Sequence, residues 1–376
     1  MLLHFSILAL ILLLSLIYEN RIKEEKLVPV LEGKPIIYSK STLAPWLLLF
    51  SLIVFYASVR QNVNDTYVYM NIFNDLEASW DNIISILSDT SKDKGFYILQ
   101  NLFKMYVSTD FHMWFFFIAL IEGAIFVSFF RRRATSYLDS MFFFFCSTMY
   151  YNFFSMMRQW LAVSIVVFAF SFVEKKKFVP YLLLCLLAAQ FHNSAYFVIP
   201  VFFLVQGASW GKKQISIIGL FSCCMLLLQP ILSSLENSTQ DATYSYVVSA
   251  MNSNNGSSII RPIIAIVPVV LSYIAKKRMD GKDRTIDLCV NYSLLNFMLS
   301  FLAVFTSGLY ITRLSIYFNV YNVILYPYLL NVAYKDQPNQ KLIKTGFYIF
   351  YFAFYMFDMI YSGAFPYFSD VIGYFG

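Results

Sequence analysis

Long uncharged apolar runs, separated by short basic turns, make up most of this chain. The clearest pair lies between Gln159 and His192, where the basic turn 174–177 joins two runs that carry no charge. Such runs predict membrane helices joined by a cytoplasmic turn. Hydrophobic residues make up 59% of the 376 residues and charged residues only 13%, a balance that no soluble domain of this size carries on its surface. We therefore expect an all-α, polytopic integral membrane protein.

The two arms of this hairpin bring an arginine and a histidine back to the same side. Each arm gives about 22 Å of helix, against a hydrocarbon core of about 30 Å. Because the turn is basic, the positive-inside rule places it in the cytoplasm and places Arg158 and His192 at the opposite, outer face. We expect both side chains to lie recessed in a polar cavity.

The pattern of runs predicts about twelve transmembrane helices in a single membrane domain over residues 1–376. The expected spans are 1–18, 41–59, 111–130, 137–154, 159–173, 178–191, 195–206, 215–232, 259–275, 285–305, 314–330 and 345–361. Outer loops are expected near 60–110 and 235–258. The first should contain amphipathic helices near 67–76, 81–88 and 96–107. The second is interpreted either as a lid or as a disordered connector.

The 28 basic residues support this orientation. Twenty-one of them fall in the turns assigned to the cytoplasm and seven on the outer side. Three of the seven are lysines of the first loop. The other four are all arginines, each at the outer end of a predicted span: Arg60, Arg158, Arg261 and Arg313.

Two interpretations of these arginines stay open. Arginine side chains can extend to the membrane interface as simple anchors. Alternatively, they bind an anionic substrate, because the planar guanidinium offers paired donors that match phosphate and carboxylate, whereas an anchor works equally well as lysine.

Three further residues are candidates for the same outer site. His192 has an ordinary pKa near 6.5 and is either a general base or a hydrogen-bonded interfacial histidine. Asp65 is either a second candidate base or the cap of a helix beginning at Thr66. Tyr317 lies four residues after Arg313, so the two share a helix face.

Several chemistries have no support in the sequence. Nucleotide-binding glycine loops, zinc motifs and a nucleophilic serine elbow are absent, so we expect no cofactor and no metal. The five cysteines lie inside apolar runs and are expected to be buried free thiols. The basic residues are spread over several turns, which does not predict nucleic-acid binding.

Three sequence blocks resemble the EpsG family of membrane proteins, the Wzy-like polymerases of bacterial exopolysaccharide and O-antigen synthesis. The first is NFFSMMRQWLAVSI followed by a basic turn and LLAAQFHNSAYFVIPVF, which contains Arg158, Gln159 and His192. The second is RQNVNDTYVYMNIF, and the third is ITRLSIYFNVYNVILYP. One departure is Asn64, where the family pattern often has glycine before Asp-Thr.

This resemblance implies a glycosyltransferase that joins oligosaccharide repeat units carried on undecaprenyl diphosphate, at the outer face of the bacterial cytoplasmic membrane. It implies a glycosyltransferase C-like fold by family analogy. Expected partners are the lipid-linked oligosaccharide, membrane lipid, and a chain-length regulator and flippase of the same pathway. His192 and Asp65 are then the catalytic candidates, and Arg158, Arg313, Arg60, Arg261, Gln159 and Tyr317 the substrate-binding ones.

Two other functions compete with this one. A transporter or flippase for lipid-linked sugars would also need arginines in an amphipathic cavity, and a sugar ligase or membrane acyltransferase would also need a histidine base. A transporter should carry polar residues through its spans. Charged residues such as Glu122, Asp139, Asp287 and Asp358 are expected near the ends of their spans, which favours a one-sided enzyme.

Overall fold

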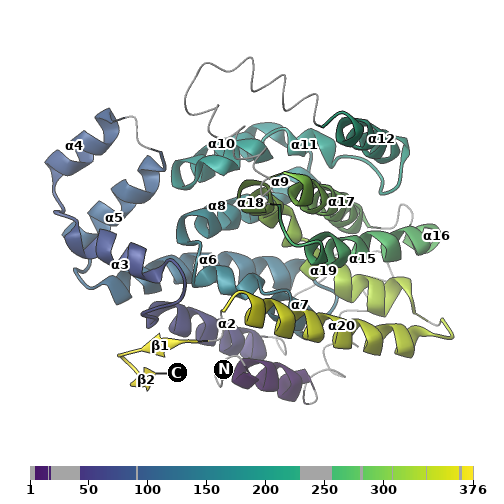
Figure 1. The fold of residues 1–376 in the computed structure, drawn as a ribbon, viewed down its shortest axis with the longest axis horizontal. Coiled ribbons are helices and arrows are strands. Elements are labelled where there is room, and N and C mark those ends of the chain that lie inside the picture. Colours follow the sequence, from purple (N-terminus) through teal and green to yellow (C-terminus); the bar gives the residue numbers. More distant parts are fainter. Residues whose placement is uncertain are drawn as a thin grey trace. The chain divides into compact units, whose positions relative to one another are not determined.

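The computed structural model describes residues 5–15, 17, 43–89, 92–228, 256–279, 283–306, 308–335, 337–363 and 366–375. They belong to two compact units, one from residues 1–199 with 335–376 and one from residues 200–334. The described part of the chain is α-helical, as expected (Figure 1). The one short sheet in it joins β1 (Phe368–Ser369) antiparallel to β2 (Tyr374–Phe375). The single membrane domain stays a prediction.

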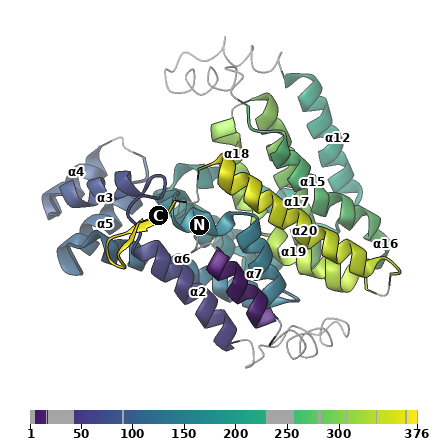
Figure 2. The ribbon, with the colours of Figure 1, turned by 60° about the horizontal axis from the view of Figure 1, so that its bottom comes forward.

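Apolar helices form the body of the first unit. They are the helix Phe5–Ser15, α2 (Leu43–Ser58), α6 (Phe111–Arg133), α7 (Tyr137–Cys146), α8 (Met157–Phe168), α9 (Phe170–Glu174), α10 (Phe178–Phe191) and α20 (Gln340–Tyr361). α6 packs against α2 and α7 (Figure 2). It also packs against α8, and α8 packs in turn against α10. Aromatic rings fill these contacts; Phe126 of α6 stacks on Trp160 of α8 with centroids 4.6 Å apart.

The hairpin of α8 to α10 closes at its basic turn as the sequence predicts. Lys176 takes a left-handed φ of 55° there. Pro180 lies in the first turn of α10, where the absence of its N–H breaks no helical hydrogen bond. Arg133 at the end of α6 forms an ion pair with Glu174 beside the turn.

The segment predicted as the first outer loop is a packed group of three helices, α3 (Thr66–Asp75), α4 (Trp80–Ser88) and α5 (Lys94–Tyr106). Ser79 caps α4 by accepting a hydrogen bond from the backbone of Asn82. Lys104 closes the end of α3, since its Nζ donates to the carbonyl oxygens of Phe73, Asn74 and Leu76 at 2.7, 2.9 and 2.8 Å. These three helices match the predicted amphipathic segments within two residues.

An aromatic cluster fixes this loop group to the membrane helices. Phe73 of α3 and Phe96 and Phe103 of α5 surround Trp114 of α6 in a buried cluster that extends to Leu161 of α8. The loop is therefore part of the packed first unit.

The second unit contains α11 (Val201–Leu204), α12 (Lys212–Leu226), α15 (Ile260–Ile274), α16 (Lys276–Met279), α17 (Arg284–Phe305), α18 (Gly308–Asn319), α19 (Asn322–Tyr328) and the π-helix η4 (Leu329–Ala333). α17 packs against both α15 and α18. Gly308 permits the start of α18 to approach the residues before α15 closely, because a Cβ there would lie 2.8 Å from the backbone nitrogen of Ser257.

The twelve expected spans are not confirmed. Three described helical stretches are long and apolar enough to cross a membrane, namely 111–133, 157–174 and 284–305. Seven further apolar helices in the described residues are shorter, and α20, with 22 residues, is long enough but is not one of the three candidate spans. The expected span 137–154 ends at Cys146 and continues as the 3₁₀ helix η2 (Met149–Phe153), because Thr148 takes a left-handed φ of 59°. The expected span 314–330 is interrupted after Asn319 and ends in a π-turn following Pro327.

The exposure of two cysteines differs from expectation, and most of the segment 235–258 lies outside the described residues. Cys223 and Cys224 on α12 are exposed, contrary to the prediction that all five thiols are buried. Their positions on an apolar helix do not force them inward, because a membrane helix can turn small apolar residues toward lipid. The expected outer segment 235–258 lies outside the described residues except for 256–258.

Candidate functional site

Arg158 lies in the first turn of α8 and is the centre of a polar group in the first unit. Its Nη1 donates to Asp93 Oδ2 at 2.9 Å and to the hydroxyl of Tyr97 at 3.0 Å. Its guanidinium carbon also lies 6.0 and 5.7 Å from the ring centroids of Tyr69 and Tyr97. The Arg158 side chain is 32% exposed.

Asp93 joins the two ends of the α8–α10 hairpin. Its Oδ2 accepts from Arg158, and its Oδ1 accepts from the backbone N–H of Asn193 at 3.0 Å. Asn193 directly follows His192, the first residue after α10. The two polar ends of the hairpin therefore meet at one carboxylate, which belongs to the outer loop.

His192 uses one ring nitrogen to cap the turn that follows it. Its Nδ1 accepts from the backbone N–H of Ser194 at 3.3 Å and lies 2.6 Å from Ser194 Oγ. A backbone N–H can only donate, so Nδ1 is the unprotonated nitrogen and the neutral ring carries its proton on Nε2. In this tautomer Nε2 is a donor.

Asp65 stands at the start of α3 but does not cap it. The helix begins at Thr66, as the sequence suggests, yet the Asp65 side chain makes no cap hydrogen bond and is exposed. Burial raises the pKa of Tyr69, Arg158 opposes that rise, and Asp65 adds to it. Asp65 and Arg158 therefore lie within electrostatic reach of the same phenol.

The backbone at Asn64 explains why asparagine can stand where the resemblance leads us to expect glycine. Its φ is 47°, in the left-handed region that glycine occupies freely and that asparagine tolerates better than most residues. Asparagine at this position therefore keeps the backbone that a glycine would allow.

Arg60 is buried, with 1% of its surface exposed. Its Nε donates to Thr66 Oγ1 at 3.1 Å, its Nη1 donates to the carbonyl of Ala57, and its guanidinium lies 4.2 Å from the ring centroid of Phe115. Burial lowers the pKa of Arg60 to about 10, and Glu122 opposes the shift, so the side chain stays cationic at neutral pH. Arg60 thus organises the start of the outer loop; its predicted role in binding substrate stays a prediction.

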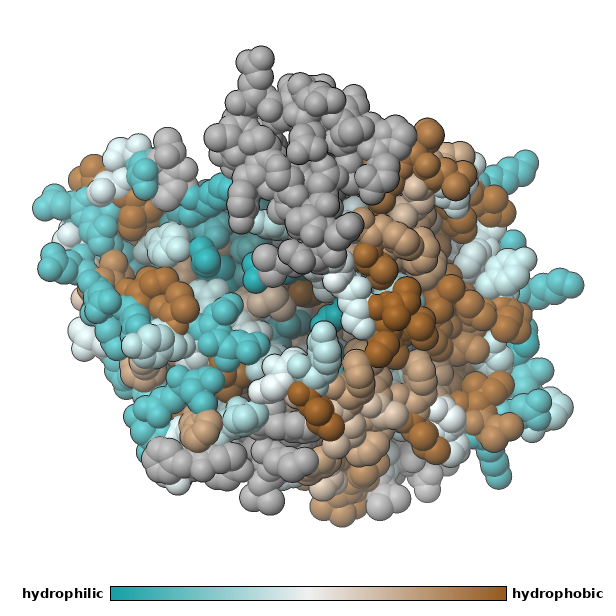
Figure 3. All heavy atoms as spheres, in the orientation of Figure 1, coloured by the Kyte–Doolittle hydropathy of each residue, from teal (hydrophilic) through white to brown (hydrophobic). Residues whose placement is uncertain are grey.

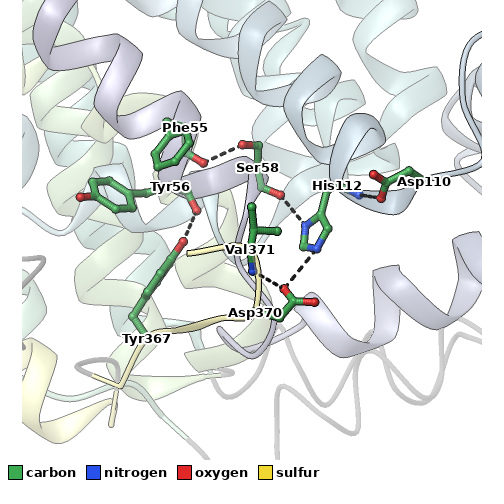
Figure 4. Close-up of polar contacts among 8 residues, drawn as sticks. All are labelled: Phe55, Tyr56, Ser58, Asp110, His112, Tyr367, Asp370 and Val371. Carbon is green, nitrogen blue, oxygen red and sulfur yellow. Dashed lines mark hydrogen bonds and ion pairs between the residues drawn. The ribbon is translucent and has the colours of Figure 1, made fainter. Parts of the chain in front are cut away.

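The C-terminal segment closes the same corner of the unit (Figure 4). The hydroxyl of Tyr367 donates to the carbonyl of Tyr56 at 2.7 Å, and the backbone N–H of Gln61 donates to the carbonyl of Phe368 at 3.0 Å. His112 Nδ1 lies 2.9 Å from the carbonyl oxygen of Ser58, and its Nε2 lies 3.4 Å from Asp370 Oδ1. The end of α2 and the start of α6 therefore adjoin.

The remaining candidates are divided between the units. Gln159 is buried in α8. The second unit holds Arg261, exposed in the first turn of α15, together with the half-buried Arg313 and the buried Tyr317 on α18. The structure brings Arg158, Asp65 and the His192 turn together around Asp93 and Tyr69. The roles of Arg261, Arg313 and Tyr317 stay predictions.

Sequence reasoning missed Asp93, Tyr97 and Tyr69. The available signal was the triplet Asp93-Lys94-Gly95, an acidic residue and a glycine at the start of an amphipathic segment. Its partners lie 65 and 100 residues further along the chain, so that triplet alone does not reveal the contact.

Comparison with known proteins bears on the whole arrangement. The sequence model of the EpsG family matches residues 43–369, which include every candidate residue of both units. Comparison with curated proteins finds no match, and comparison with solved structures finds none either. Because the match extends over most of the chain, the protein belongs to the EpsG family.

Proposed function

We propose that this protein is a polysaccharide polymerase that joins undecaprenyl-diphosphate-linked oligosaccharide repeat units at the outer face of the bacterial cytoplasmic membrane. Family membership supports a polymerase of this type. One observation connects the proposal to specific residues. The partly exposed Arg158 and the turn that follows His192 both donate a hydrogen bond to Asp93.

The proposed reaction consists of three changes at the site. The acceptor hydroxyl oxygen bonds to the anomeric carbon, the bond from that carbon to the diphosphate oxygen breaks, and the hydroxyl proton passes to a base. Undecaprenyl diphosphate leaves as an anion, so its departure is favoured by guanidinium donors already in place. The diphosphate activates the donor sugar, and no nucleotide or other cofactor is required.

We assign the leaving diphosphate to Arg158. Its contacts to Asp93 and Tyr97 hold one side of the guanidinium, which limits the side-chain entropy lost when a phosphate binds the exposed part. Arg313, Arg60, Arg261, Gln159 and Tyr317 remain predicted ligands of the sugar or diphosphate.

The base is assigned to Asp65 and a donor role to His192. The neutral tautomer of His192 presents Nε2–H, which suits donation to a sugar or phosphate oxygen rather than removal of a proton. The exposed Asp65 carboxylate is an acceptor without a cap hydrogen bond. A His192 base would require Ser194 to release Nδ1 first.

The setting of the reaction is part of the proposal. The polymerase receives lipid-linked units from a flippase and acts with a chain-length regulator, and its outer face is the periplasm or cell exterior. A glycosyltransferase C-like fold is proposed on family analogy alone.

One observation keeps a transporter as the alternative. Glu122 lies close to the middle of α6, where it is buried, and not near the end of its span as expected. A buried carboxylate in the middle of a membrane helix is the kind of residue that transporters use. The Glu122 carboxylate favours the charged form of Arg60, which is itself part of the loop packing. This structural role of Glu122 fits a one-sided enzyme equally well.

A reconstitution experiment tests the proposal. Purified protein is incubated with lipid-linked repeat units, and the products are separated by gel. A polymerase gives a ladder of increasing length. Transfer of one unit to a different acceptor would indicate a ligase, and movement of intact units across the bilayer without any ladder would indicate a flippase.

A further inference from the structure

We infer that Asp93 is a positioning residue, which holds Arg158 and the turn after His192 at a fixed separation for an anionic lipid substrate. The inference rests on the proposed function, since it names what Arg158 binds. Three independent features of the segment 93–95 support it.

The first feature is how the Asp93 carboxylate is used. Asp93 occupies the cap position of α5, where aspartate normally accepts from the first turn of its own helix. Here it makes no cap hydrogen bond. Its two oxygens instead reach Arg158 and the backbone N–H of Asn193, one to each end of the hairpin.

The second feature is the backbone. Asp93 has φ 61° and ψ 33°, a left-handed conformation that is unfavourable for most residues with a Cβ. A residue keeps such a conformation only where surrounding contacts compensate for it. The ion pair with Arg158 and the hydrogen bond from Asn193 are those contacts.

The third feature is the close approach of α5 to α10. A Cβ at Gly95 would lie 2.7 Å from the Cβ of Gln190 and 3.0 Å from its carbonyl oxygen. Only glycine fits this contact without a shift of the backbone. Gly95 thus brings the start of α5 against the end of α10, which is the position from which Asp93 reaches both partners.

Together these features hold the Asp93 carboxylate within hydrogen-bond distance of Arg158 and Asn193 and place its negative charge beside the guanidinium. Asp93 is buried, so its charge on Arg158 is screened less than that of a surface carboxylate. A guanidinium fixed on one side by a carboxylate presents its remaining donors in one orientation. Within this packing, one carboxylate contacts both Arg158 and the turn after His192.

The test compares Asp93→Asn with a matched control, Asp75→Asn, which makes the same change at an exposed position of the same loop. The probe is undecaprenyl diphosphate without sugar, titrated in detergent micelles and measured by native mass spectrometry. We expect Asp93→Asn to elute as a folded protein and to bind the probe about 10- to 100-fold more weakly, the size expected for one charge-assisted hydrogen bond. The control should bind as the wild type does.

A double-mutant cycle separates positioning from a merely structural role. If Asp93 acts through Arg158, then Asp93→Asn should weaken binding little further in an Arg158→Ala background. Additive losses would overturn the inference. So would tighter binding by Asp93→Asn, which would mean that the carboxylate competes with the substrate for Arg158. If Asp93→Asn does not fold, Gly95→Ala displaces the carboxylate without removing it, and the same loss of binding is expected.

Hydrogen exchange provides a readout that needs no ligand. Asp93→Ala should raise exchange in the peptide containing Asn193, and Asp75→Asn should not. Unchanged exchange would refute the contact itself. If the wild type binds the probe but makes no polymer, the polymerase proposal fails while the binding data still decide the role of Asp93.

Discussion

Two arginines of the first unit show how differently the same side chain is used. Arg60 is fully buried among Ala57, Thr66 and Phe115, whereas the Arg158 side chain is 32% exposed beside Asp93 and Tyr97. Of the two, only Arg158 lies within reach of an external anion. Substitutions at Arg158 are therefore the most informative at the scale of single residues.

Arg158→Lys should lose most of its polymerase activity while the protein inserts and folds normally. Lysine keeps the positive charge but lacks the planar fork that a diphosphate and Asp93 both use. We expect turnover to fall about 100-fold, the size seen when one preorganised donor to an anion is removed. Ladder formation by equal amounts of folded protein measures this. Full activity in both Arg158→Lys and Arg158→Ala would reduce Arg158 to an interface anchor.

Asp65→Asn and His192→Ala together identify the base. Loss of a general base should lower turnover about 10²- to 10⁴-fold with little effect on donor binding. We expect that pattern for Asp65→Asn, and a loss in both turnover and binding for His192→Ala, because His192 donates to the substrate. Separate measurements of turnover and of undecaprenyl diphosphate binding distinguish the two. The reverse pattern would return the base to His192, and unimpaired turnover in both variants would exclude either residue.

At the scale of elements, α4 carries an apolar stripe that no described residue covers. Trp80, Ile84 and Leu87 recur at helical spacing and are 57%, 62% and 58% exposed.

The loop that contains α4 begins and ends at the same place. The contact between Ser58 and His112 joins the end of α2, where the loop begins, to the start of α6, where it ends (Figure 4). In Figure 3 the surface over α3, α4 and α5 is largely hydrophilic, with separate hydrophobic groups.

We expect α4 to lie in the bilayer surface with this stripe in lipid. A spin label at Ile84 should be reached by dissolved oxygen more than by a water-soluble nickel relaxant, and a label at Ser85, also exposed but on the polar face, should show the opposite. Electron paramagnetic resonance of the protein in liposomes measures both. Equal access of the nickel relaxant to the two positions would place α4 in water.

Element positions were predictable where an uncharged apolar run or a regular hydrophobic period decides them. The helix 178–191 follows from an apolar run and the three loop helices follow from apolar spacing, and both signals depend only on neighbouring residues. The break after Cys146 and the π-turn after Pro327 depend on competing local hydrogen bonds that hydropathy does not register. The polar site was predictable at Arg158 and His192, because charge stands out in an apolar run. Asp93 was missed because it comes from a charged loop and meets partners distant in sequence.

At the level of the whole molecule, the proposed reaction requires the Arg158 site to face the outer side of the membrane. A cysteine at Asn74, exposed at the end of α3, should react with an impermeant thiol reagent applied from outside, and one at Lys277, exposed in α16, should not. The basis is the separation of basic residues between the two sides. Cys223 and Cys224 are themselves exposed, so the background needs both replaced. Reversed labelling would place the Arg158 site on the cytoplasmic side.

In the proposed reaction one undecaprenyl diphosphate carrier leaves for each linkage made, at the site centred on Arg158. The most direct measurement follows a purified reaction in liposomes and counts rungs of the product ladder and released undecaprenyl diphosphate in the same samples. We predict rungs spaced by one repeat unit, one undecaprenyl diphosphate released per linkage, and neither product with Arg158→Ala. Carrier release without a ladder, or a ladder that Arg158→Ala forms as fast as the wild type, would contradict the account.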